Sequence, residues 1–144
     1  MNKYPFFIHA LHWLTVVLIT LQILFGFLME DWVPLFLGHI ILGSTLLLTS
    51  ILRLFCRKKY HLPSKPHNLT KLQWKLAKFG HSLLYIGLIF VPISGILAAI
   101  YEEFFEEVHE TMVFLFIGLI IGHVFMVIKH LVLDKVNLIK RMSL

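Results

Sequence analysis

Charged residues are scarce in this chain of 144 residues. Only 15% of them are Asp, Glu, Lys or Arg, whereas soluble domains average about a quarter. Hydrophobic residues make up 58% of the chain, which excludes an ordinary soluble domain. Cysteine is nearly absent as well: Cys56 stands alone, so no internal disulfide can form.

What the chain does have is long hydrophobic runs. Four of them, at about 5–29, 34–55, 79–100 and 104–133, reach the length of about 20 residues that a helix needs to cross a bilayer. Lipid does not tolerate unpaired backbone groups, so each run is expected to be helical. The runs leave no room for a second domain. The sequence therefore predicts an all-α integral membrane four-helix bundle, with residues 1–144 as one transmembrane domain.

Positive charge is absent from one side of these predicted spans. All 13 Lys and Arg lie before the first span, around the connection between the second and third, or around the end of the fourth. The positive-inside rule then places both termini in the cytoplasm. Of the eight acidic residues only Asp134 shares that side, and the others lie outside: Glu30, Asp31, Glu102, Glu103, Glu106, Glu107 and Glu110. The net charge of +5 therefore indicates membrane topology. We expect the protein to contact membrane lipid and to bind no nucleic acid.

Histidines recur at matching depths in these spans. His109 and His123 are fourteen residues apart in the last one, which places them about 21 Å apart and within about 40° of the same helix face. By depth, His39 pairs with His109 near the outside, and His12 pairs with His123 near the inside. Paired neutral imidazoles suit the iron of a b-type haem. A single histidine can equally hydrogen-bond across a bundle, but the matched set favours two haem b groups.

Three further residues lie toward the inner side. Arg53 follows His39 by fourteen residues, so it lies at the inner haem level, where it would pair with a haem propionate or a quinone head. A boundary arginine that only marks the helix end is an equally good interpretation. His81 and His130 are shallower. They are candidates for a quinone site or a proton relay, or they are interfacial histidines without such a role.

Several stretches resemble the bacterial cytochrome b561 family of four-helix dihaem membrane cytochromes. They are IHALHW at 8–13, FLGHIILG at 36–43, FGHSLLYIGLIFVPISGIL at 79–97, VHET at 108–111 and IGHVFMVIKH at 121–130. The resemblance implies haem ligation by His12, His39, His109 and His123, and places His81 and His130 near a ubiquinone. It also implies a multi-pass protein of the bacterial inner membrane. Some members of the family oxidise superoxide while reducing ubiquinone.

The expected function is electron transfer by a membrane dihaem b-type cytochrome between a periplasmic donor or acceptor and the ubiquinone pool. Superoxide is one candidate donor, which would make the protein a superoxide:ubiquinone oxidoreductase. The acidic outer side should repel superoxide, however, and attract a basic redox protein. Two alternatives stay open: a cytochrome b subunit that anchors a hydrogenase or dehydrogenase, and a haem-free carrier of protons or ions that uses its histidines as a relay.

Overall fold

The computed structural model describes residues 6–29, 32–60, 69–101 and 103–133. They form four helices, α1 (Phe6–Leu28), α2 (Val33–Lys59), α3 (Lys71–Tyr101) and α4 (Glu103–Val132), with no strand among the described residues. All four helices are long and apolar enough to cross a membrane. The predicted fold class is therefore confirmed, whereas the cytoplasmic placement of the termini stays a prediction.

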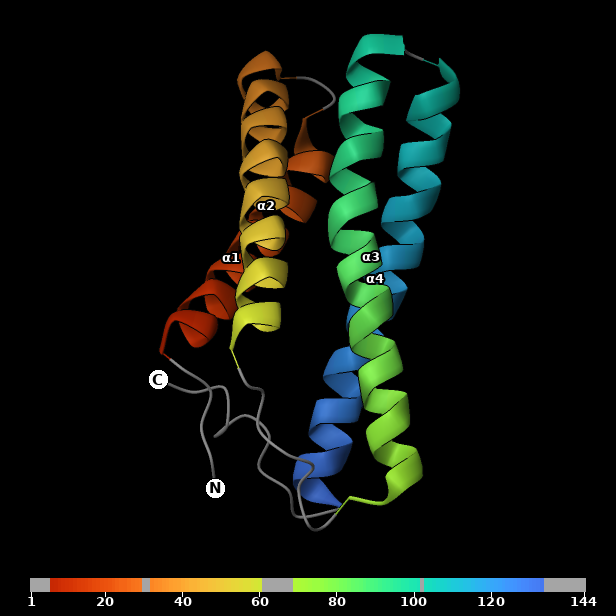
Figure 1. Cartoon of the computed structure of the whole chain (residues 1–144). Helices are drawn as coiled ribbons and strands as arrows, with labels where there is room; N and C mark the ends of the chain where they lie inside the picture. The colour runs from red at the N-terminus through yellow and green to blue at the C-terminus, as the bar shows by residue number, and fades with distance from the viewer. Residues whose placement is uncertain (1–5, 30–31, 61–68, 102, 134–144) are drawn as a thin grey trace.

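The helices form two antiparallel hairpins that lie next to each other (Figure 1). Packing is most extensive between α1 and α2 and between α3 and α4, and α2 and α3 join the two hairpins. We call the end where α2 ends and α3 begins the inner end, and the end where α3 passes to α4 the outer end.

Helix α3 begins well before the third predicted span. Its start is fixed by a reciprocal pair of hydrogen bonds: the Gln73 backbone N–H donates to Thr70 Oγ1 at 3.1 Å, and the Thr70 N–H donates to Gln73 Oε1 at 2.8 Å. This capping box satisfies two N–H groups that the first helical turn leaves unpaired. The turn that carries Lys71, Lys75 and Lys78 is thus part of α3.

Each helix contributes one residue to a central apolar cluster, made of Leu18, Leu46, Leu88 and Phe116. Gly87 permits the close approach of α3 to α4, because a Cβ at this position would collide with the Phe116 ring. Most other apolar side chains face outward, among them Phe55, Phe90 and Phe125. An apolar exterior around a small core is what lipid as the solvent requires.

The core cluster divides the bundle into two levels. On α4, Phe116 lies seven residues after His109 and seven residues before His123. On α2, Leu46 lies seven residues after His39 and seven residues before Arg53. Seven residues correspond to a rise of about 10.5 Å. The fold therefore places an outer pair of histidines on one side of the core, and Arg53 and His123 on the other.

Candidate functional site

The outer level brings two of the predicted ligands together. The imidazole rings of His39 on α2 and His109 on α4 have centroids 6.2 Å apart and planes at 79°. Imidazole nitrogens bind metal ions at about 2.0–2.1 Å, so two rings on opposite sides of one ion have centroids about 6 Å apart once a ring radius is added on each side. The centroid distance of the outer pair therefore matches that of two histidines that share one metal ion.

Helix α3 holds the His109 ring in place. The Nδ1 atom of His109 lies 3.1 Å from the Val91 carbonyl oxygen and 3.0 Å from Ser94 Oγ. The Ser94 hydroxyl itself donates to the Val91 carbonyl at 2.8 Å. A carbonyl only accepts, so Nδ1 carries the proton and Nε2 keeps its lone pair. Histidines that bind metals commonly donate their second N–H to a carbonyl in this way.

A glycine on α3 makes room for this ring. A Cβ at Gly95 would lie 2.9 Å from His109 Cε1, so the ring occupies the space that any other residue would fill. Sequence reasoning did not single out Ser94 or Gly95, although both lie inside the PISG segment at 92–95. The signal was their place one turn after Val91 and two turns after Leu88 on the helix that packs against α4.

The other ring is approached by α1. Gln22 Nε2 donates to the His39 carbonyl oxygen at 3.0 Å, and a Cβ at Gly26 would lie 3.2 Å from His39 Cε1. Among the described residues, the buried His39 Nδ1 has no hydrogen-bond partner. Such orphaned polar atoms are costly in a folded protein unless a ligand or water satisfies them. Gln22 and Gly26 were also missed from the sequence.

At the inner level, Arg53 contacts one of the predicted ligands directly. Its Nη2 lies 3.1 Å from His12 Nδ1. Since a guanidinium only donates, His12 Nδ1 accepts this hydrogen bond and the ring proton of neutral His12 is on Nε2. Arg53, His81, His123 and His9 all lie near His12, and we call Arg53, His12, His81 and His123 the inner cluster. His130 is buried toward the inner end of α4.

The rings of the inner cluster are paired differently from the prediction. Within the described part of the chain, His123 has its ring contact with His81, at 5.1 Å and 78°, and His12 has its contact with Trp13. The His81 Nδ1–H donates to the Ala77 carbonyl oxygen at 2.7 Å. A centroid distance of 5.1 Å is too short for a metal ion between the rings, so His81 and His123 touch directly. The inner level thus has suitable donors, but the described pair of His81 and His123 is not spaced for iron.

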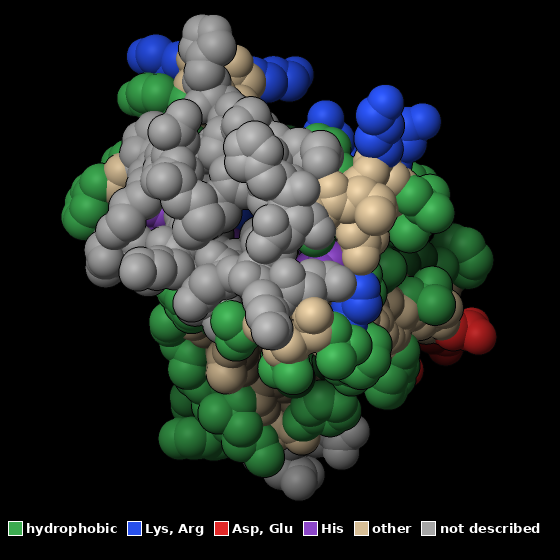
Figure 2. Space-filling view, turned by 90° about the horizontal axis from the view of Figure 1, so that it is seen from below, with side chains coloured by type: hydrophobic (Ala, Val, Ile, Leu, Met, Phe, Trp, Pro, Cys, Tyr) green, Lys and Arg blue, Asp and Glu red, His purple; other side chains and the backbone are tan. Residues whose placement is uncertain are grey.

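The two ends of the bundle differ in charge. Lys and Arg side chains gather along part of the margin of the inner end (Figure 2), and Lys58, Lys59, Lys71, Lys75 and Lys78 are exposed there. At the outer end, the first turns of α4 expose Glu103, Glu106, Glu107 and Glu110. A charged partner outside the membrane would therefore meet a negative surface at the outer end.

A membrane-spanning bundle with histidines facing one another across its helices is consistent with a membrane b-type cytochrome. Residues 3–143 match the prokaryotic cytochrome b561 family. The chain therefore belongs to this family, as its resemblance predicted, and membership implies that it binds haem b. No curated protein matches the chain.

Proposed function

We propose that the protein is a dihaem electron carrier that connects a redox partner outside the membrane with the ubiquinone pool. The observation that carries this proposal is the outer pair, in which His39 and His109 are spaced for one iron. Haem supplies reversible one-electron chemistry when it is bound. The protein's own part is to position both rings and to keep water away from them.

His12 and His123 are the proposed ligands of the inner haem. One observation and one general principle support this assignment. Both histidines lie in the inner cluster, and an ionisable side chain at this depth of the membrane costs free energy and usually serves a function. Haem binding here requires His12 to release Arg53. Once released, Arg53 has the charge and the position to pair with a propionate.

Ubiquinone is the proposed partner at the inner end, near Arg53, His81 and His130. These residues supply hydrogen-bond donors for the quinone oxygens and a route for the protons that quinone reduction consumes. At the outer end, the exposed carboxylates of α4 favour a basic redox protein over superoxide. The bacterial inner membrane is the location that matches both partners.

The first experiment is a count of haem per chain in purified protein, by pyridine haemochrome assay and reduced-minus-oxidised spectra. We expect two b haems in the wild type and one in His109→Ala. The matched control is His81→Ala, which removes an imidazole that is too close to its neighbour to share an iron and should keep both haems. A wild-type protein without haem would refute the proposal and favour the histidine relay.

The same assay tests the inner ligand pair. His12→Ala and His123→Ala should each lose one haem, and the haem that remains should be the same in both variants. If His81→Ala loses a haem and His12→Ala does not, the inner ligand assignment is wrong while the outer one stands.

A further inference from the structure

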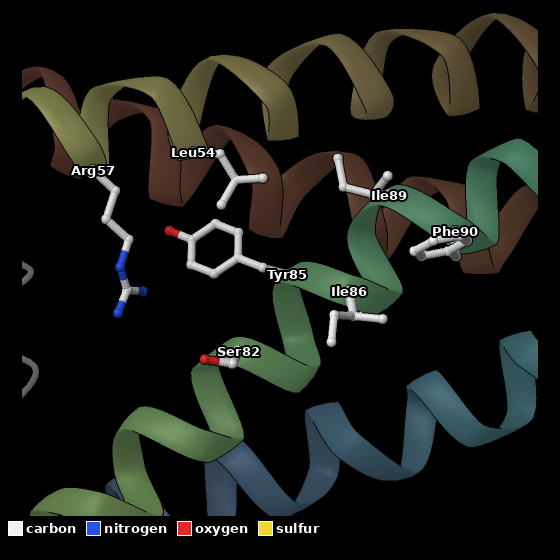
Figure 3. Close-up of a pocket in the computed structure, with 7 residues that line it drawn as sticks. All are labelled: Leu54, Arg57, Ser82, Tyr85, Ile86, Ile89 and Phe90. Atoms are coloured by element: carbon white, nitrogen blue, oxygen red, sulfur yellow. The ribbon is translucent and has the colours of Figure 1, made fainter.

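A groove on the α2–α3 face is polar at one end and apolar at the other (Figure 3). Arg57, Ser82 and Tyr85 line the polar end, and the Tyr85 ring extends toward α2. Ile86, Ile89 and Phe90 line the rest of the groove, and the Ile86 and Phe90 side chains are more than half exposed, at 53% and 54%. The groove thus opens on the apolar exterior of the bundle.

Two guanidinium groups approach the Tyr85 ring; Arg57 lines the groove, whereas Arg53 is not among its lining residues. The guanidinium carbon of Arg57 lies 5.1 Å from the centroid of the Tyr85 ring, and that of Arg53 lies 5.5 Å from the same centroid. Contact with an aromatic face stabilises a cation only modestly. All carboxylates of the described residues belong to α4, between Glu103 and Glu110 near the outer end. Within the described part of the chain, no acidic side chain therefore neutralises this arginine pair.

The two arginines differ in what they face. Arg53 is hydrogen-bonded to His12 and belongs to the inner cluster. Arg57 lies one turn closer to the inner end, two residues before α2 ends at Lys59, and it faces the groove. A basic residue in the last turn of a spanning helix lies at the level of the lipid headgroups.

The apolar half of the groove runs from this level toward the middle of the bundle. Ile86, Ile89 and Phe90 follow Ser82 along α3 at spacings that keep them on one helix face. From Ser82 to Phe90 the helix rises about 12 Å. An occupant must therefore carry an anion at one end and a hydrocarbon chain at the other.

We propose that this groove is a binding site for an anionic phospholipid. The phosphate contacts Arg57 beside Tyr85, and one acyl chain lies along Ile86, Ile89 and Phe90. A quinone has a hydrocarbon tail as well, but its head is neutral and would leave Arg57 without a counter-charge. Bidentate pairing with phosphate is a preferred interaction of arginine. This site needs no haem, and it adjoins the proposed quinone site at Arg53, which also contacts the Tyr85 ring.

The test is native mass spectrometry of the purified full-length protein after exchange into detergent with added phosphatidylglycerol or phosphatidylcholine. We expect wild-type protein to retain one phosphatidylglycerol under conditions that strip phosphatidylcholine. Arg57→Gln should bind phosphatidylglycerol at least about tenfold more weakly, because a charge-assisted hydrogen bond to phosphate is lost. The matched control is Lys58→Gln, which removes the same charge from an exposed neighbour and should bind like the wild type.

A second variant keeps the charges and fills the groove. Ile86→Trp places a larger side chain in the apolar half and should also reduce retention of phosphatidylglycerol, with an unchanged helical circular dichroism spectrum. Equal retention by Arg57→Gln and Lys58→Gln would overturn the proposal. So would displacement of the bound lipid by a ubiquinone analogue at equal concentration, which would assign the groove to quinone instead. Displacement by inorganic phosphate alone would show that the acyl chain contributes nothing, and would also overturn it.

Discussion

Ser94 offers a test of how α3 controls the outer haem. Its hydroxyl oxygen lies 3.0 Å from His109 Nδ1, and Nδ1 carries a proton because it also faces the Val91 carbonyl. Accepting a hydrogen bond from this N–H makes the opposite nitrogen a stronger donor to iron. A stronger donor stabilises the oxidised haem. Ser94→Ala should therefore raise the midpoint potential of the haem bound by His109.

The size of the shift follows from the single hydrogen bond that is lost. A neutral hydrogen bond contributes about 0.5–1.5 kcal/mol, and a tenfold change in a one-electron equilibrium, about 1.4 kcal/mol, corresponds to about 59 mV. The expected rise is about 20–65 mV. The ring itself should stay in place, because the Val91 carbonyl still accepts from Nδ1 at 3.1 Å.

The assay is a potentiometric titration of the haem absorption bands in wild type, Ser94→Ala and Ser94→Thr. The threonine variant keeps the hydroxyl and should titrate like the wild type. Ser44→Ala is the matched control, because it removes a hydroxyl whose described hydrogen bond goes only to its own helix, to the Ile40 carbonyl at 2.9 Å. A lower potential in Ser94→Ala, or equal shifts in Ser94→Ala and Ser44→Ala, would refute the reasoning.

Three further predictions concern the two sites and the outer surface. Gly95→Ala places a methyl group 2.9 Å from His109 Cε1 and should remove one haem per chain in the haemochrome assay. Gly80→Ala is the control, because no atom lies within 4 Å of the added Cβ, and this variant should keep both haems. Arg53→Gln removes a cation from the inner cluster and should lower the potential of one haem only; a shift of both haems would contradict the two-level arrangement. The double substitution Glu106→Gln and Glu107→Gln removes two exposed carboxylates and should slow reduction by a basic redox protein in stopped-flow mixing at low salt. Faster or unchanged reduction would exclude that kind of partner.

The spans could be predicted from the sequence because a bilayer imposes a single period and a minimum length on every element. Hydrophobicity alone does not give the start of α3, since the apolar run begins at Phe79 and the helix begins eight residues earlier, at Lys71. The helical spacing of Lys71, Lys75 and Lys78 is the sequence signal for this earlier start, and the hydrogen bonds between Thr70 and Gln73 fix it. Hydrophobicity locates the membrane, whereas capping determines where the helix begins.

For the histidines, the sequence predicts the height along the helix but not the neighbour that each ring faces. Fourteen-residue spacing predicts the height of His109 and His123, and the structure places His109 against His39. Height does not specify which neighbouring helix a ring faces. Spacing therefore could not predict that His123 contacts His81 or that Arg53 contacts His12. Ser94 and Gly95 hold the His109 ring in place. Both belong to α3, which carries neither His39 nor His109.

The difference between the levels has a geometric origin on α4. Each step of seven residues turns the side-chain direction by about 20°, so His123 points about 40° away from His109. Within the described residues, His109 meets α2 and α3 while the ring contact of His123 is on α3 alone. On the proposed ligand assignment, the outer rings already have the required spacing, whereas His12 must first release Arg53 before the inner haem can bind. Binding to a prearranged site avoids that cost.

This difference predicts the order in which the sites fill. Protein purified from haem-limited cells should hold its haem mainly at the outer site, because His39 and His109 already have the required spacing. Its reduced-minus-oxidised spectrum should then match that of His123→Ala from haem-replete cells, in which only the outer haem remains. A spectrum that matches His109→Ala instead would show that the inner site binds more tightly. In that case the contact between His12 and Arg53 does not oppose haem binding, and the argument from arrangement fails.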